Sequence, residues 1–276
     1  MSRRATVTAI PKAPPVEPLR PGAAPLAILL DYDGTVAQTD VGDMVMAEHV
    51  TSDWEPIVAA YDEGRTGSRR TMEAELALLR ATEDELMATA VAQPHDPGVA
   101  VLARRAAGAG VPVEIVSDGF AFYVPDAMAA LDLEDLPIVA ASTTFSGDRA
   151  RIAFPNGHPS CLVCGTCKRQ RVLAHQAAGR AVVFVGDGES DRYAAGYADV
   201  VFAKRSLVRI CVEAGWAFQR WTEFAEIDGW LARVLEDWRR NPASLPGPVA
   251  RPFFCGPEAW GEGRTEPPPG AWPPPR

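Results

Sequence analysis

Two aspartates directly follow a short apolar run near the N-terminus. Asp31 and Asp33 stand two residues apart in LAILLDYDGT, and residues i and i+2 leaving a strand can project to the same side, so both can serve one ligand. Gly34 permits a sharp bend immediately afterwards. Two carboxylates this close repel each other, so we expect a positive group between them. The pair therefore predicts a cation site.

A second acidic pair and a lysine occur later in the chain. Asp187 and Asp191 follow the apolar run AVVFV within GDGESD, and Lys168 precedes the helix-like stretch that leads into that run. Oxygen ligands from two strand ends, with coordination positions left vacant, suit a hard divalent cation such as Mg²⁺. The predicted magnesium ligands are Asp31, Asp33, Asp187 and Asp191.

Carboxylates around Mg²⁺ with a lysine and a serine opposite are typical of a phosphoryl site. The Ser117 hydroxyl and nearby backbone amides, such as that of Gly119, can hold one phosphate oxygen while Lys168 neutralises another. Asp31 can attack phosphorus and form an aspartyl phosphate. Asp33 can protonate the leaving alcohol and later deprotonate the water that releases phosphate. We therefore expect a phosphatase with a small phosphorylated substrate.

Five short apolar runs must position these side chains. Each is apolar almost throughout, as strands buried on both faces must be, and helix-like stretches alternate with them. This alternation predicts an α/β fold with a doubly wound parallel sheet, in which ligands bind beyond the carboxyl ends of the strands. The predicted strands are residues 26–30, 111–116, 138–141, 181–185 and 200–203.

The interval between the first two predicted strands spans about 80 residues, although a crossover needs only about 12. Helical spacing within it predicts a helical cap over residues 40–95, inserted into a catalytic core of residues 26–39 and 96–240. Thr82 and Glu85 have the spacing of a capping box at the start of its last helix. Residues 143–154 predict a hairpin.

Proline and charge are distributed unevenly. Six of the 25 prolines lie in residues 1–25 and eleven in 241–276, which predicts a disordered Pro-rich tail at each end. The net charge is −9, and because the first tail carries +3 and the second is neutral, the part between them carries −12. So acidic a body repels nucleic acid and anionic lipid surfaces. With no long apolar run or leader-like segment, we expect a cytoplasmic protein with neither partner.

Together these motifs resemble the haloacid dehalogenase superfamily of phosphatases. The four signatures are DYDGT from Asp31, then Ser117, then Lys168, then GDGESD around Asp187, and the resemblance covers about residues 26–205. It implies that Asp31 is the nucleophile, Asp33 the acid/base, and Ser117 and Lys168 the phosphate holders. It also implies Mg²⁺ on Asp31, Asp187 and the Asp33 carbonyl, with Asp191 close by or acting through water. Dehalogenases of the superfamily lack the second aspartate, so the chain resembles the phosphatase branch.

Within that superfamily the predicted cap is similar to that of the phosphoserine phosphatase subgroup. The CxxCxxCK run ending at Lys168 and the VVFAK run ending at Lys204 most resemble the methionine-salvage branch, whose substrate is 2-hydroxy-3-keto-5-methylthiopentenyl 1-phosphate. Asp40 stands where phosphoserine phosphatases have a cap-facing glutamate, and Glu75 where their carboxylate-binding arginine aligns. A glutamate there would repel a substrate carboxylate. Asp118 replaces a glycine and adds an anion near the phosphate.

Several alternatives stay open at the level of sequence. Besides a methylthio-ketose phosphatase, the motifs allow a phosphoserine phosphatase, a non-catalytic phosphometabolite-binding protein, or a phosphotransferase that passes the phosphoryl group to another sugar. Three arginines in the predicted cap and one histidine either form solvated surface or meet the substrate; they are Arg65, Arg69, Arg70 and His49.

Three of the five cysteines have metal-like spacing. Cys161, Cys164 and Cys167 are separated by two residues each, but a zinc site needs a fourth ligand, which His158 or Cys211 would have to supply. Otherwise they are reduced thiols in a loop beside Lys168. An odd number of cysteines in a chain of this length does not indicate a disulfide framework.

Overall fold

The structure is a computed structural model that describes residues 9–245 and 255–268. Its centre is a sheet of six strands: β1 (Leu26–Leu30), β2 (Val113–Val116), β3 (Ile138–Val139), β6 (Ala181–Gly186), β7 (Val200–Ala203) and β8 (Gln219–Arg220). Their order is β3-β2-β1-β6-β7-β8, and every neighbouring pair is parallel. The predicted fold class is confirmed, with β8 added at one edge.

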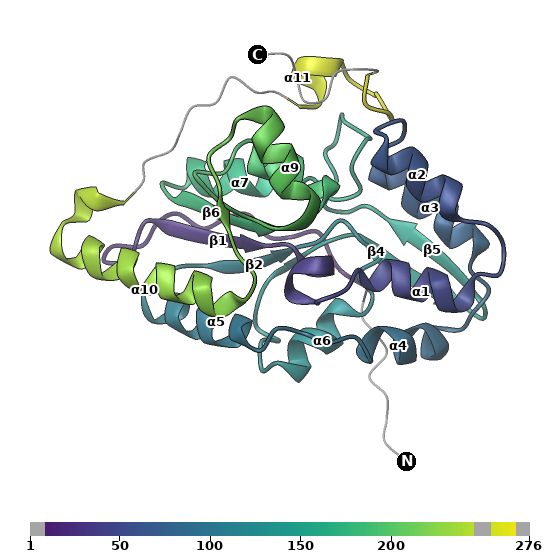
Figure 1. Cartoon of the computed structure of the whole chain (residues 1–276), viewed down its shortest axis with the longest axis horizontal. Coiled ribbons are helices and arrows are strands. Elements are labelled where there is room, and N and C mark those ends of the chain that lie inside the picture. Colours follow the sequence, from purple (N-terminus) through teal and green to yellow (C-terminus); the bar gives the residue numbers. More distant parts are fainter. Residues whose placement is uncertain (1–8, 246–254, 269–276) are drawn as a thin grey trace.

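Helices cover both faces of this sheet (Figure 1). The core helices are α5 (Gly98–Gly108), α6 (Val124–Ala130), α7 (Lys168–Ala177), α8 (Arg192–Ala195), α9 (Arg205–Ala214) and α10 (Phe224–Arg240). Alternate residues of β1 belong to two different apolar clusters: Ile28 and Leu30 share one with residues of α5 and α10, whereas Leu29 shares the other with residues of α7 and α9. Burial on both faces explains why the strands are apolar throughout.

Four helices inserted between β1 and α5 form the cap. They are α1 (Val41–His49), α2 (Glu55–Asp62), α3 (Ser68–Leu78) and α4 (Glu83–Val91). The capping box is present, because the Thr82 amide donates to the Glu85 carboxylate at 2.8 Å and the Glu85 amide donates to Thr82 Oγ1 at 3.4 Å. The predicted hairpin is also present as β4 (Ser142–Ser146) and β5 (Arg149–Ala153), and β5 packs beside α3 (Figure 1).

Parts of both predicted disordered tails contact the rest of the chain. Ile10 is buried, the Ala13 amide donates to Asn156 Oδ1 at 2.7 Å, and Arg180 donates to the Glu17 carbonyl at 2.7 Å. At the other end, the Glu266 carboxylate accepts a hydrogen bond from an amide of the cap. Prolines remove donors but leave carbonyls, which core arginines can bind. Residues 1–8, 246–254 and 269–276 of the predicted tails lie outside the described residues.

No helix among the described residues is long and apolar enough to cross a membrane.

A charged side chain lies inside the sheet. Glu114 of β2 faces α7 and accepts a hydrogen bond from Arg171 Nε at 2.7 Å, and His175 Nε2 is 3.0 Å from the same carboxylate. Burial alone would raise the pKa of Glu114, but hydrogen bonds from His175 and Arg171 outweigh it and lower that pKa below its usual value.

This ion pair predicts an acid-sensitive contribution to stability. A carboxylate with a lowered folded-state pKa stabilises the fold above its unfolded pKa of about 4.3, and this stabilisation is lost as pH falls through the folded value. Glu114→Gln should lower the free energy of unfolding at pH 7 by about 3–5 kcal/mol, because Arg171 loses its buried partner. It should also flatten the decline below pH 4. Urea unfolding measures both effects, and the exposed Glu134→Gln serves as control; equal curves for the two variants would contradict the assignment.

Candidate active site

The first aspartate of the predicted site lies at the carboxyl edge of the sheet. Asp31 directly follows β1, and the backbone then turns at Gly34, whose φ is +69°. A Cβ at Gly34 would collide with the Asp187 carboxylate, so both the left-handed φ and the close approach require glycine. The turn thus places the loop after β1 directly against the loop after β6.

Three of the four predicted metal ligands lie together. Asp31, Asp187 and Asp191 each offer a carboxylate oxygen within 4.8 Å of the others. Asp191 also shapes its own loop, because its Oδ2 accepts the amides of Asp187 at 2.8 Å and Gly188 at 2.9 Å. Buried carboxylate oxygens at this spacing suit Mg²⁺.

Lys168 joins the carboxylates of this site. Its Nζ lies 2.6 Å from Asp31 Oδ1 and 2.6 Å from Asp191 Oδ1, and it donates to Ser190 Oγ at 3.0 Å. Burial alone would lower the pKa of Lys168, but Asp191 and Asp31 outweigh it and raise the pKa, so the ammonium stays charged. Burial and Asp191 raise the pKa of Asp31, while Lys168 acts in the opposite direction. Lys168, together with Arg205, which donates to Asp187 Oδ2, gives two cations against three carboxylates, which leaves a demand for further positive charge.

Asp33 is held apart from these ligands. Its Oδ1 accepts the Val41 amide at the start of α1 at 3.1 Å and the Tyr123 hydroxyl at 3.0 Å. Its carboxylate is therefore outside the group of three, and the role of Asp33 as a metal ligand through its carbonyl stays a prediction. Burial and the charge of Asp40 raise the pKa of Asp33 to about 8, so at neutral pH it carries a proton that it can donate.

Ser117 and Gly119 lie beside Asp33, just after β2. Ser117 Oγ is 3.4 Å from Asp33 Oδ2 and accepts the Gly119 amide at 3.2 Å. A Cβ on Gly119 would lie only 2.5 Å from Asp33 Oδ2, so glycine allows the two loops to approach. The structure thus brings every predicted site residue to one edge of the sheet.

Asp118 turns toward the cap. It accepts hydrogen bonds from Ser68 Oγ of α3 at 2.5 Å and from the Thr166 amide at 2.7 Å. Burial raises the pKa of Asp118 to about 6. The Asp118 carboxylate, which we expect near the phosphate, therefore also links the core to the cap and to the loop that precedes Lys168.

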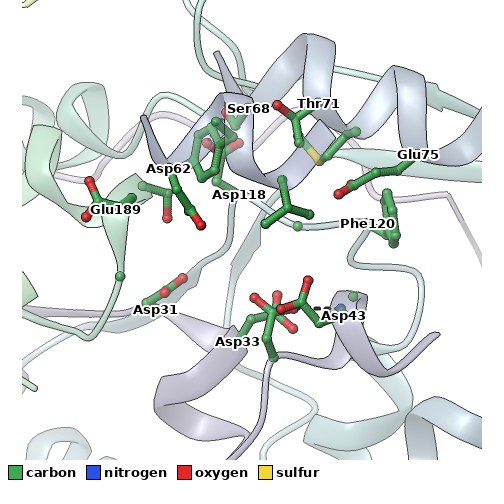
Figure 2. A pocket seen from close by; sticks show the side chains of 18 of the residues that line it. Asp31, Asp33, Asp43, Asp62, Ser68, Thr71, Glu75, Asp118, Phe120 and Glu189 are labelled. Atoms are coloured by element: carbon green, nitrogen blue, oxygen red, sulfur yellow. Dashed lines mark hydrogen bonds between the residues drawn. The ribbon is translucent and has the colours of Figure 1, made fainter. Parts of the chain in front are cut away.

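A cavity of about 270 Å³ opens between this edge and the cap (Figure 2). Val58, Met72 and Phe120 supply apolar surface, and Glu75 points into it from α3. Among the described residues that line it, there are acidic side chains but no lysine, arginine or histidine. The acidic residues are Asp31, Asp33, Asp40, Asp43, Asp62, Glu75, Asp118, Asp187 and Glu189. Burial, then Asp43 and Asp40, raise the pKa of Glu75 to about 8.

Arg205 and Tyr123 also belong to the site, although neither was predicted from the sequence. Arg205 donates to Asp187 Oδ2 at 3.1 Å and to the Gln38 carbonyl at 2.7 Å, and it follows β7 just as other site residues follow their strands. That position was the signal that could have identified it. Tyr123 gives no comparable signal, since its hydroxyl reaches Asp33 only through the path of the loop after β2.

Four cap residues whose contact with the substrate the sequence left undecided lie away from the cavity. Arg70 pairs with Glu266 at 2.9 Å, and Arg69 donates to the Cys164 carbonyl at 3.3 Å. Arg65 pairs with a neighbouring glutamate, and His49 Nε2 lies 2.7 Å from Thr89 Oγ1. None of the four lines the cavity, so the structure supports the reading in which they do not meet the substrate.

This chain is similar to known proteins. Two relatives are named 2-hydroxy-3-keto-5-methylthiopentenyl-1-phosphate phosphatase: that of Brevibacillus brevis is 23% identical over 216 residues, covering 77% of this chain and 97% of its own; that of Exiguobacterium sibiricum is 28% identical over 210 residues, covering 73% and 94%. A solved structure of a phospho-aspartyl intermediate analogue of phosphoserine phosphatase aligns with a TM-score of 0.58 at 16% identity, covering 78% of this chain and 99% of that one. It shows the same fold.

The family model for haloacid dehalogenase-like hydrolases matches residues 28–196. The match begins within β1 and ends after Asp191, so it includes all four signatures. It covers more than half of the chain and confirms the resemblance drawn from the motifs. The chain belongs to the haloacid dehalogenase-like hydrolase family.

Proposed function

We propose that this protein is a magnesium-dependent phosphatase that hydrolyses a small phosphorylated metabolite through an aspartyl phosphate. The observation that carries the proposal is the position of Asp31: it lines the cavity, lies within 4.8 Å of Asp187 and Asp191, and is 2.6 Å from the Lys168 ammonium. A carboxylate at a cavity, beside an ammonium that can offset the charge of a phosphate, is suited to attack a phosphate ester.

The reaction takes two steps. An Asp31 oxygen bonds to phosphorus, the ester P–O bond breaks, and Asp33 gives its proton to the leaving alcohol oxygen. Asp33 then takes a proton from water as the water oxygen bonds to phosphorus and the aspartyl P–O bond breaks, which restores both aspartates and releases phosphate. Lys168, Ser117 and the Gly119 amide hold phosphate oxygens. Asp31, Asp187 and the Asp33 carbonyl would hold Mg²⁺, which neutralises charge on the phosphate when bound.

The substrate that we favour is a methylthio-ketose phosphate. Relatives that align over most of the chain are named as phosphatases of such a compound. A protonated Glu75 can donate to a ketone or hydroxyl oxygen, and Val58, Met72 and Phe120 offer apolar surface to a methylthio group. Phosphoserine is the weaker candidate, because its carboxylate would lie among acidic side chains and meet no basic one in the described lining of the cavity.

The proposal is tested by measuring phosphate release from a panel of phosphate esters with and without Mg²⁺. The panel comprises an aryl phosphate, phosphoserine, sugar phosphates and the methylthio-ketose phosphate. We expect magnesium-dependent release, with the highest kcat/KM for the last. Tight binding without release would establish the phosphometabolite-binding alternative, and transfer of the phosphoryl group to added alcohols would establish the phosphotransferase.

Substrate charge provides a prediction for Glu75. Wild-type enzyme should hydrolyse glycerol 3-phosphate with a kcat/KM on the order of 100-fold above that for 3-phosphoglycerate, because the carboxylate of 3-phosphoglycerate would lie among acidic side chains with no cation in the described lining to pair with, and like charges placed together cost several kcal/mol. Glu75→Arg should reverse much of this difference by supplying a cation inside the cavity. The matched control is Glu73→Arg, an exposed position of the same helix. If both arginine variants treat the two esters like wild type, Glu75 does not contact the leaving group.

A further inference from the structure

Four cysteines from two distant parts of the chain line one small cavity. Cys161, Cys164 and Cys167 come from the loop between β5 and α7, and Cys255 comes from the described C-terminal segment, residues 255–268. Backbone hydrogen bonds join the two parts, since the Leu162 amide donates to the Arg264 carbonyl at 3.0 Å. All four cysteines are free thiols, and this cavity is separate from the one that contains Asp31.

We propose that these four thiols form a structural zinc site that ties the C-terminal segment to the loop preceding Lys168. Structural zinc takes four ligands, commonly four cysteines, and a pair separated by two residues is a frequent source of two of them. The spacing of Cys161, Cys164 and Cys167 already satisfies this pattern. The missing fourth ligand is Cys255, which no sequence spacing could identify.

The two fourth ligands expected from the sequence are less suitable. Cys211 belongs to α9 and is buried in the apolar cluster on one face of the sheet, outside the cavity of the four thiols. His158 lines that cavity, but its Nδ1 accepts the amides of Ser160 and Cys161, both at 3.0 Å. One of its two ring nitrogens is therefore already occupied within the loop.

An arginine beside the thiols suits a site of four thiolates. Zinc with four thiolates carries two net negative charges. Arg169 can offset part of this charge, because its Nη1 lies 3.6 Å from Cys255 Sγ and donates to the Cys255 carbonyl at 2.6 Å.

Binding must draw the thiols closer together. Zn–S bonds of about 2.3 Å place the sulfurs of a tetrahedral site about 3.8 Å apart. Among the described residues, the group of three possible ligand atoms within 4.8 Å of one another is that of the active-site aspartates, and the thiols form no such group. The sulfurs therefore have to approach one another when zinc binds. Cys161, Cys164 and Cys255 lie outside helices and strands, so this closure requires movement of loops alone.

The site would act as a positioning element. Cys167 is the residue immediately before α7, and Lys168 is the first residue of that helix. A metal bond to Cys167 would fix the beginning of α7 and with it the lysine that pairs with Asp31. It would also hold the segment whose Trp260 ring packs against Tyr193, with ring centroids 5.9 Å apart.

The experiment is metal analysis of the purified full-length chain in buffer containing Mg²⁺. We expect about one zinc per chain, four thiols protected from a thiol-specific reagent, and, after exchange with Co²⁺, the thiolate-to-cobalt charge-transfer absorption that oxygen ligands do not give. Cys255→Ser should weaken zinc binding at least tenfold. Cys211→Ser, a change to a cysteine outside the cavity, should keep zinc and the cobalt spectrum.

The wild-type measurements stand even if Cys255→Ser fails to fold. Protein that holds no zinc and takes none up, with the thiols of Cys161, Cys164, Cys167 and Cys255 all reactive, would overturn the proposal. So would zinc that survives Cys255→Ser and Cys164→Ser but is lost in Asp187→Asn, since that metal would occupy the aspartates. Iron and sulfide in place of zinc would also overturn it, because they indicate a cluster.

Discussion

Asp31→Asn should abolish turnover, lowering kcat by at least about a thousandfold, because the amide cannot form the phosphoryl–enzyme bond and transition-state effects of this kind appear in kcat. The substitution keeps the shape of the side chain. Lys168 keeps its bond to Asp191 at 2.6 Å, so the buried ammonium retains a partner and the fold should persist. Phosphate release from an aryl phosphate measures the loss, and urea unfolding verifies that the variant is folded.

The matched control is Asp148→Asn, an exposed aspartate at the turn of the hairpin, which should retain wild-type kcat. Acid quenching during turnover should also trap a phosphorylated wild-type protein and none in Asp31→Asn. If Asp31→Asn retained a tenth of the wild-type rate, Asp31 would not be the nucleophile, and another group at the edge of the sheet would have to take that role.

The sequence was sufficient to predict which residues meet at the sheet edge. Parallel strands buried on both faces are apolar, so polar residues directly after them stand out, and their carboxyl ends share one edge by topology. That reasoning is enough to locate Asp31, Ser117 and Asp187. It applies equally to Arg205, which follows β7.

The directions of side chains could not be predicted in the same way. Asp33 lies two residues from Asp31, yet the amide at the start of α1 and the Tyr123 hydroxyl turn its carboxylate away from the other three aspartates. Likewise, the sequence places Asp118 beside the serine signature but cannot show that Ser68 of the cap binds it at 2.5 Å. Both outcomes depend on contacts between segments whose relative position is fixed only by the packed fold.

The contacts made by the ends of the chain also could not be predicted from composition. A proline-rich segment was predicted to be disordered because it buries little apolar surface. Arg180 and Arg171, however, donate to carbonyls of residues 14–18, an interaction that composition does not reveal. The position of Cys255 could not be predicted for a related reason, since its neighbours in space are far away in sequence.

Removal of Mg²⁺ should stop phosphate release and lower the stability of the fold. A ligand present at 100 times its Kd stabilises the folded state by about 2.7 kcal/mol, so saturating Mg²⁺ should raise Tm measurably and a chelator should reverse the shift. Asp187→Asn should abolish both the activity and the Tm shift. Asp62→Asn changes another acid lining the same cavity, outside the group of three, and should keep both.

Without Mg²⁺, the difference in stability between wild type and Asp187→Asn should have the opposite sign from the difference with Mg²⁺. Burial and the charge of Asp191 raise the pKa of Asp187 to about 6. The folded state therefore binds more protons than the unfolded chain between about pH 4 and pH 6, so without Mg²⁺ the stability contributed by this group falls as pH rises through that window. Asp187→Asn removes one of the mutually repelling carboxylates, and it should thus make the metal-free protein more stable at pH 7 than wild type while abolishing the gain from Mg²⁺. A variant that loses stability in both conditions would show instead that the Arg205 contact with Asp187, and not repulsion among carboxylates, dominates at this edge of the sheet.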